Sequence, residues 1–345
     1  MRISVSGLTL MLVCLHAQPK RPQTPQAPFP YQSQEVSVPS KAAGVTLACT
    51  LSVPQGEGPH PAMVLVTGSG PQDRDETVFG HRPFLVIADY LARHGVGTLR
   101  CDDRGTGKST GRFLGATTAD FSLDAEGAFN YLSNRPEFKK VGIAGQSEGA
   151  VIAPMVASRR PAVAFVVMLA GVGVRGDIVG YSQAAAIQRA RGVPEEAIQR
   201  NLKMQQTLIA LASSGATEGE MRRQVREKFA TTPDSERIIL LLKDPWHRWF
   251  IDYDPEPMLE KVKCPVLVLN GDLDLQVVAD LNVPAIEAAF HKGGNQHVTV
   301  RRFPKLNHLF QTAITGSPDE YPQIEETIAP VVLETIVNWL DQTAR

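Results

Sequence analysis

The residues Val141-Gly142-Ile143-Ala144-Gly145-Gln146-Ser147-Glu148-Gly149 decide the fold of this 345-residue chain. A short apolar run comes before a serine that stands between two glycines, and a helix-forming stretch, Ala150-Val151-Ile152-Ala153, follows. This order predicts a sharp turn from a strand into a helix, with the serine hydroxyl exposed at the end of a sheet. Gly145 and Gly149 leave room for the turn. The alternative is an ordinary strand-to-helix turn whose serine caps the helix.

Short apolar runs alternate with helical segments on both sides of this turn. The expected strands are 62–67, 97–100, 141–144, 164–170, 265–269 and 298–303, and the expected helices are 83–94, 118–134, one from 148, 283–290 and 325–342. Such alternation predicts a mostly parallel, doubly wound α/β sheet covered on both faces. Residues 34–53 instead alternate with period two around Gly44, which predicts an antiparallel β-hairpin.

Residues 176–258 break the strand–helix rhythm. They are helical by period and contain no buried strand run, and Pro194 with two following glutamates predicts a helix start. The residues expected to share one apolar helix face are Ile198, Leu202, Leu208, Ile209 and Ala212. We interpret 176–258 as a helical cap inserted into one α/β core made of 34–175 and 259–345.

Bulk composition limits the partners and the redox chemistry. The hydrophobic share is 43% and the charged share 21%, as in chains that bury a core, and the net charge of −1 gives no reason to expect a nucleic-acid partner. The four cysteines have no C-x-x-C spacing, so we expect no metal site and buried free thiols, with one disulfide as the alternative.

The first residues are typical of an export signal. Arg2 is followed by the apolar run Leu8–Val13 and by Ala17, and the run is too short to span a bilayer. We therefore expect a signal peptide at 1–17, a Pro-rich linker at 18–33, and a periplasmic or secreted protein. Lipid attachment at Cys14, which would tether it to the envelope, and an uncleaved disordered tail are the alternatives.

A serine nucleophile needs a histidine base and an acid that orients it, at the carboxyl ends of strands. Two places fit, and both come after the turn. Asp272 and Asp274 directly follow the strand 265–269, and the residues alone do not choose between them. His308 directly follows the strand 298–303, whereas the rival histidines at 291 and 297 precede that strand in a polar stretch.

Taken in order, these motifs resemble the α/β-hydrolase superfamily. Within it they resemble bacterial serine carboxylesterases, relatives of dipeptidyl aminopeptidases, that carry a Gly-Ser-Gly-Pro-x-Asp-Arg-Asp loop. The matching motifs are Gly68-Ser69-Gly70-Pro71-Gln72-Asp73-Arg74-Asp75, Asp103–Ser109, Gly145–Gly149, Gly271-x-x-Asp274-x-x-Val277 and Asn307-His308. The resemblance covers roughly residues 34–345.

The resemblance implies a catalytic triad of Ser147, Asp274 and His308. Asp272 is then left as a turn-forming side chain. It also makes 103–109 a structural loop, with Asp103 and Arg104 in ion pairs. The same segment is not a phosphate loop, because Asp102 stands where that motif requires a glycine.

Acyl transfer also needs backbone N–H groups that face the oxyanion. We expect one from Glu148, which follows the nucleophile, and one from Ser69 in the loop after the strand 62–67, with Gly70 as the alternative donor. A plain glycine-rich turn is the other interpretation of that loop. Asp73–Asp75 either shape the pocket or form a surface charge network.

An aromatic cluster closes the expected cap. Trp246, His247, Trp249 and Phe250 gather there, and such a cluster is more often a core that fixes a cap to its domain. The alternative is a substrate pocket, for which the candidate residues are Trp246, Trp249 and Phe250 together with Gly70.

We therefore predict a serine hydrolase that cleaves small carboxylic esters, with short acyl chains, through an acyl-enzyme. No metal or organic cofactor is expected, and the sequence assigns no oligomeric state. An exopeptidase or amidase and an acyltransferase are alternatives on the same triad. A non-catalytic binding protein that keeps the fold is an alternative of another class.

Overall fold

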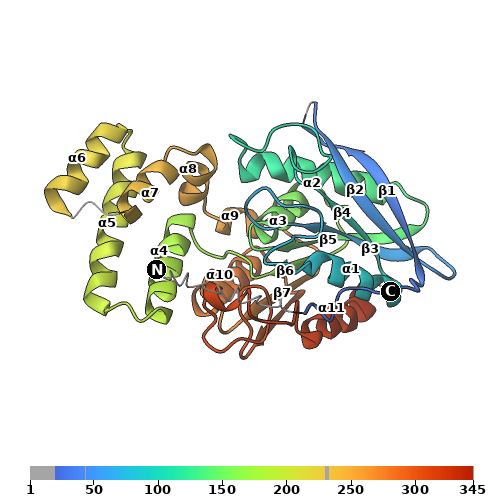
Figure 1. The fold of residues 1–345 in the computed structure, drawn as a ribbon. Coiled ribbons are helices and arrows are strands. Elements are labelled where there is room, and N and C mark those ends of the chain that lie inside the picture. Colours follow the sequence, from blue (N-terminus) through green and yellow to red (C-terminus); the bar gives the residue numbers. More distant parts are fainter. Residues whose placement is uncertain (1–19, 43, 230–232, 345) are drawn as a thin grey trace, which may run out of the picture.

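The computed structural model describes residues 20–42, 44–229 and 233–344, so the expected signal segment 1–17 lies outside the described residues. Its centre is one eight-stranded sheet with the order β1-β2-β4-β3-β5-β6-β7-β8 (Figure 1). The strands are β1 (Tyr31–Pro39), β2 (Thr46–Pro54), β3 (His60–Val66), β4 (Gly97–Cys101), β5 (Phe138–Gln146), β6 (Val166–Leu169), β7 (Val266–Gly271) and β8 (Val298–Phe303).

The first two strands form the predicted antiparallel hairpin, and β2 also pairs antiparallel with β4. Every pair from β4 to β8 is parallel. Parallel strands bring their carboxyl ends to one edge, so the residues after β3, β5, β7 and β8 meet there.

Helices cover both faces of the sheet, which is why β6 and β7 are buried along their whole length. Helices α1 (Pro83–Arg93) and α11 (Pro330–Thr343) pack on one face. Helices α2 (Thr118–Ser133), α3 (Gly149–Arg159) and α10 (Ala279–Lys292) pack on the other. These layers confirm the predicted doubly wound α/β fold.

The segment between β6 and β7 carries the helices that we interpreted as a cap. They stand to one side of the sheet (Figure 1). They are α4 (Gly176–Ala190), α5 (Glu195–Ser213), α6 (Glu218–Lys228), α7 (Pro233–Leu241) and α8 (Pro245–Asp252), and the short α9 (Glu256–Leu259) leads back to β7. On α5 the predicted apolar face is buried except for Leu202, which is half-buried. The cap has its own apolar core, to which α5, α6 and α7 contribute.

Two segments differ from the expectation. The last helix begins at Pro330 and not near residue 325, because proline suits the first turn of a helix, and residues 304–329 form a long loop with one 3₁₀ turn, η1 (Pro318–Glu320). The described part of the Pro-rich run is docked on this loop. Arg21 Nη1 donates to Ile324 O at 3.0 Å, and Gln23 Nε2 donates to Ile328 O at 2.7 Å.

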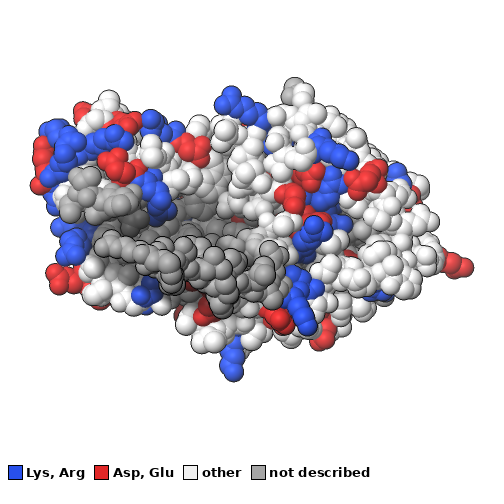
Figure 2. Space-filling model, in the orientation of Figure 1, with Lys and Arg blue, Asp and Glu red and all other residues white. Residues whose placement is uncertain are grey.

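Charged side chains of both signs are spread over the face of the molecule seen in Figure 2. On the face in Figure 2, basic and acidic side chains lie close together over the cap and over the core, so no broad area has one sign. Among the described residues, no helix is both long and apolar enough to cross a bilayer.

Cys49 of β2 and Cys101 of β4 form a disulfide, so the expectation of free thiols at these two positions was wrong. The two residues stand directly opposite each other on the antiparallel strands. The sequence could not reveal this pairing, because it depends on β2 lying beside β4 and not beside β3. Cys264 remains a free, half-buried thiol.

We predict that the variant Cys49→Ser/Cys101→Ser loses about 2–4 kcal/mol of unfolding free energy, because the disulfide closes a loop of 52 residues in the unfolded chain. Urea denaturation without reductant measures the loss. Cys264→Ser is the matched control and should lose much less. Equal stability of the double variant and the wild type would contradict the prediction.

Candidate active site

Ser147 stands on a tight turn between β5 and α3. Its φ of 54° is the left-handed conformation that side chains rarely adopt, and its N–H donates to Leu169 O at 2.8 Å. A Cβ atom at Gly145 would lie 2.0 Å from Gly149 O, and one at Gly149 would lie 2.0 Å from Val66 O. No side chain fits at either position, so the turn requires both glycines.

His308 and Asp274 form a buried pair at the carboxyl ends of β8 and β7. His308 Nδ1 lies 2.9 Å from Asp274 Oδ2, and the two residues are 5% and 2% exposed. The other carboxylate oxygen, Oδ1, accepts the backbone N–H groups of Gln276 and Val277, each at 2.8 Å. These bonds fix the carboxylate, which in turn orients the ring so that Nε2 is the free nitrogen.

The other candidates for the acid and the base, Asp272, His291 and His297, lie outside the His308–Asp274 pair. Asp272 bonds to Arg302 at 2.7 Å at the surface, and not to His308. His291 and His297 are exposed. Of the two aspartates after β7, only Asp274 therefore reaches the histidine.

One contact joins the nucleophile turn to the histidine loop. Gln146, the residue before Ser147, donates its Nε2 hydrogen to His308 O at 3.2 Å. No hydrogen bond joins Ser147 Oγ to His308 within the described residues. Catalytic hydrogen bonds are often long or poorly aligned when no substrate is bound, so the lack of this bond does not exclude a serine–histidine pair.

Ser147, Ser69 and Glu148 line one cavity of about 80 Å³, and Trp246 and Phe250 of α8 form its cap side. The lining residues that the sequence analysis missed are Val172, Val179, Gln183, Gln276 and Val277. Of these five residues, only Val277 could have been found from the sequence, because it is the valine of the Gly271-x-x-Asp274-x-x-Val277 motif.

Two predicted pocket residues lie outside this cavity. Trp249 stacks on Tyr253 with ring centroids 4.5 Å apart and packs in the apolar cluster between the cap and the core. Gly70 lines a neighbouring cavity on the other side of the loop. Phe250 packs in the same cluster and also lines the cavity, so Trp249 is the one of these two residues that contributes to the joint alone.

The Glu148 side chain links the nucleophile turn to the cap. Its Oε1 accepts from Thr118 Oγ1 and from Trp246 Nε1, each at 2.6 Å. No cation pairs with this carboxyl group among the described residues, and burial raises its pKa. A carboxyl group without a cation partner therefore borders the cavity that Ser147 lines.

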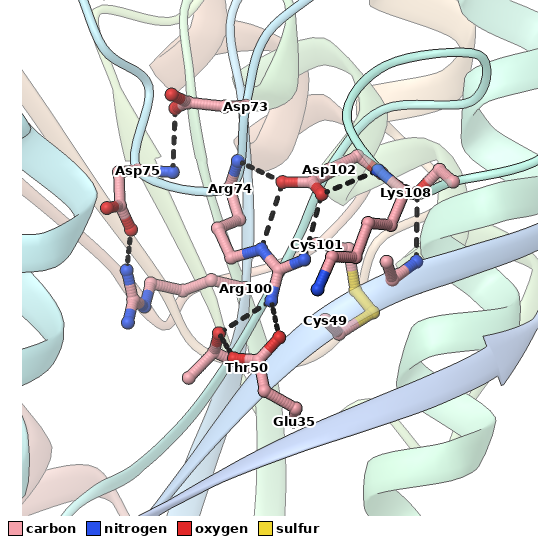
Figure 3. A network of polar contacts seen from close by, with 12 residues as sticks. Glu35, Cys49, Thr50, Asp73, Arg74, Asp75, Arg100, Cys101, Asp102 and Lys108 are labelled. Atoms are coloured by element: carbon pink, nitrogen blue, oxygen red, sulfur yellow. Dashed lines mark hydrogen bonds and ion pairs between the residues drawn. A yellow bond between two sulfur atoms is a disulfide. The ribbon is translucent and has the colours of Figure 1, made fainter.

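Two carboxyl groups that follow β4 hold the loop 68–75, and Figure 3 shows one of them, Asp102, against Arg74. Asp102 accepts both the backbone N–H of Arg74, at 3.0 Å, and its guanidinium, at 2.8 and 2.9 Å. Asp103 accepts Gln72 N–H and the hydroxyl of Thr67, each at 2.9 Å. Burial raises the pKa of Asp103 to about 7.

The expected ion pair of Asp103 was therefore wrong, because its partners are neutral donors. Arg104 does form an ion pair, with Asp124 at 2.6 Å. Asp75 pairs with Arg100, and Asp73 Oδ1 accepts the N–H of Asp75 at 3.0 Å. The charges of the loop thus fix its own backbone.

None of Asp73, Arg74 and Asp75 lines the cavity beside Ser147. Among the described residues, no group of three or more His, Cys, Asp and Glu side chains could hold a metal ion.

The chain is similar to several hydrolases. It is 28% identical over 295 residues to esterase EstD of Thermotoga maritima, covering 84% of this chain but only 64% of that esterase. Its fold resembles that of esterase Pf2001 of Pyrococcus furiosus (TM-score 0.54, 16% identity, 94% and 97% of the two chains). It also resembles Est1E of Butyrivibrio proteoclasticus (TM-score 0.53, 15% identity, 89% and 98%).

These neighbours show that the fold is that of the α/β-hydrolases. A family model matches residues 43–288, which include the loop 68–75, the nucleophile turn, the cap and Asp274. The chain therefore belongs to the X-Pro dipeptidyl-peptidase (S15) family.

Proposed function

We propose that this protein is a serine hydrolase that cleaves small carboxylic esters. One observation carries the proposal: the buried His308–Asp274 pair stands at the sheet edge where Ser147 occupies its left-handed turn, and Gln146 bonds to His308 O. A hydroxyl group, an imidazole and a carboxylate in this order are the parts of a serine nucleophile with its base.

In the proposed reaction, Ser147 Oγ attacks the acyl carbon while His308 Nε2 takes its proton. Asp274 keeps the ring in the tautomer that accepts at Nε2 and stabilises its charged form. His308 then gives the proton to the leaving alcohol. Water, deprotonated by the same nitrogen, cleaves the acyl-enzyme and restores Ser147.

The N–H groups of Ser69 and Glu148 are the proposed oxyanion donors. Both residues line the cavity with Ser147, and neither N–H donates to another group in the described part of the chain. Gly68 N–H, in contrast, is already bonded to a carboxyl group. Gly70 lines the neighbouring cavity, which favours Ser69 as the donor of this loop.

The cavity favours a short, apolar acyl group. Its apolar walls are Val172, Val179, Val277 and the ring of Phe250, the polar residues Gln183 and Gln276 also line it, and its volume is about 80 Å³. Such a site binds a few carbon atoms through apolar contact and leaves longer chains outside.

We also propose that the protein works outside the cytoplasm. The disulfide between β2 and β4 supports this location, because such bonds persist in oxidising compartments. It agrees with the export signal expected at 1–17.

A dipeptidyl peptidase is the second candidate. Glu148 favours it, because a carboxyl group without a cation partner, beside the nucleophile, could bind the ammonium group of a peptide. The family that the chain belongs to is described by an activity of this kind.

Ser147→Ala should lose at least about three orders of magnitude in kcat on an aryl ester, as expected for a triad nucleophile. The same variant should not react with a fluorophosphonate probe that labels the wild type. A wild-type protein that is folded but neither labelled nor active would favour the non-catalytic alternative.

Phe250→Ala should shift the preference of the enzyme toward longer acyl chains, since it removes a wall of the cavity. The ratio of kcat/KM for octanoyl to acetyl aryl esters should rise by about tenfold, the usual scale for a change of a few methylenes. Trp249→Ala, on the same helix but outside the cavity, is the matched control and should leave the ratio near that of the wild type.

The two candidates predict opposite substrate orders. An esterase should cleave an aryl acetate with a higher kcat/KM than an alanyl-prolyl anilide, and Glu148→Gln should lower both activities by a similar factor. If the anilide is the better substrate and Glu148→Gln reduces it about tenfold more than the ester, the peptidase is favoured.

A further inference from the structure

Glu76 follows directly on the loop 68–75 and is enclosed by the core. It is only 4% exposed and has a φ of 56°, a rare conformation for a residue with a side chain. Its own N–H donates to Asp73 O at 2.9 Å, which closes the loop into a turn. Residues in such a conformation persist where the surroundings hold them, and they cluster at functional sites.

The carboxyl group of Glu76 has one hydrogen-bond partner, the backbone of the loop. Its Oε1 accepts Gly68 N–H at 2.7 Å. Its Oε2 is buried and has no partner among the described residues. The residues that line a small cavity of about 10 Å³ with Glu76 are apolar apart from one glutamine: Pro83, Phe84, Ile87, Gln146, Leu169, Leu309, Phe310 and Ile328.

That glutamine links Glu76 to the rest of the site. A Cβ atom at Gly68 would lie 2.7 Å from Gln146 Oε1 and 3.2 Å from Glu76 Oε1, so the three residues are in close contact. Gln146 precedes Ser147 and bonds to His308 O. The Glu76 carboxyl group therefore lies where the oxyanion loop, the nucleophile turn and the histidine loop meet.

The bond to Gly68 fixes the residue next to a proposed oxyanion donor. The peptide that carries the Ser69 N–H begins at the carbonyl of Gly68, so the orientation of Gly68 sets the direction of that N–H. Without an acceptor at position 76, the Gly68 N–H would be buried and unpaired, and the loop would shift to bond it elsewhere.

We propose that Glu76 is a positioning residue for the oxyanion hole, which holds Gly68 so that the Ser69 N–H faces the reacting carbonyl. This inference rests on the proposed function. Glu76 touches no substrate; it acts through the backbone of the loop, so it affects the transition state more than substrate binding.

Because the carboxyl group of Glu76 can ionise, this role predicts that kcat depends on pH. Burial, together with the charges of Asp103 and Asp73, raises its pKa to about 8. The other groups around it, from α1, β5 and the loop after β8, bring no charge to it. The neutral acid still accepts the Gly68 N–H, whereas the anion formed at higher pH would oppose the oxyanion nearby.

The test compares Glu76→Leu with Glu76→Gln, which keeps an acceptor oxygen but cannot ionise. At pH 7, Glu76→Leu should lower kcat on an aryl ester by about 10- to 100-fold and leave KM within about threefold, less than the loss of a whole oxyanion donor. It should weaken a trifluoromethyl ketone inhibitor by a similar factor. Glu76→Gln should stay within about threefold of the wild-type kcat, since the backbone N–H remains paired.

The pH profile gives a second readout that a purely structural role would not move. Wild-type kcat should fall as the pH rises through about 8, and Glu76→Gln should lack this decline. Between pH 4.5, the ordinary pKa, and about pH 8, the folded state keeps the proton of Glu76 while the unfolded chain has lost it. The free energy of unfolding therefore falls as the pH rises through that range. The melting temperature of Glu76→Gln, relative to that of the wild type, should therefore increase as the pH rises from 5 to 8.

Glu126→Leu is the control. Glu126, on α2, is also a buried acid and is 8% exposed, but it pairs with Arg159 on α3. An equal loss of kcat in this variant, or wild-type kcat in folded Glu76→Leu, would overturn the proposal. If Glu76→Leu does not fold, an unchanged alkaline decline in Glu76→Gln overturns it instead. A wild type that is neither active nor labelled at Ser147 refutes the esterase proposal itself.

Discussion

The loop after β3 depends on buried and half-buried carboxyl groups that accept its backbone N–H groups. Glu76 accepts from Gly68, Asp103 from Gln72, and Asp102 from Arg74. A loop rich in glycine has many conformations in the unfolded chain, and each bond of this kind removes some of that freedom at a defined point. The loop can then keep one backbone shape beside Ser147 without a regular element to support it. Proteins use such pre-set backbone geometry to place dipoles before a reaction begins.

The cap and the core are joined beside Ser147, the proposed nucleophile. The cap begins where Gly176 N–H donates to Tyr253 O at 3.1 Å, so its first residue lies beside the residue that follows its helix α8. Trp246 of the cap donates to Glu148, the residue next to Ser147. A movement of α8 would therefore reach the turn at Ser147 directly. Glu148 bonds to the cap through its side chain, and its backbone N–H is one of the two proposed oxyanion donors.

Much of this architecture could be predicted from the sequence, because it depends on local patterns. Alternating apolar runs and the G-x-S-x-G turn predicted the sheet and the position of Ser147, and the order of motifs predicted that Asp274 and His308 follow later strands. Contacts between distant segments could not be predicted. The disulfide depends on which strands are neighbours, the pairing of Asp103 with neutral donors depends on the fold of the loop, and the position of Trp249 outside the cavity depends on how α8 packs against the core.

The joint at Gly176 and Tyr253 has an evolutionary consequence. An insertion whose two ends are adjacent can be lengthened, shortened or exchanged while the eight-stranded sheet keeps its register, since no strand has to move. The cap supplies part of the cavity wall, through Val179, Gln183, Trp246 and Phe250, and the core supplies the rest of the lining. An exchanged cassette would have to match the core where the two parts meet, at Glu148 and in the apolar cluster that includes Val151 and Met155.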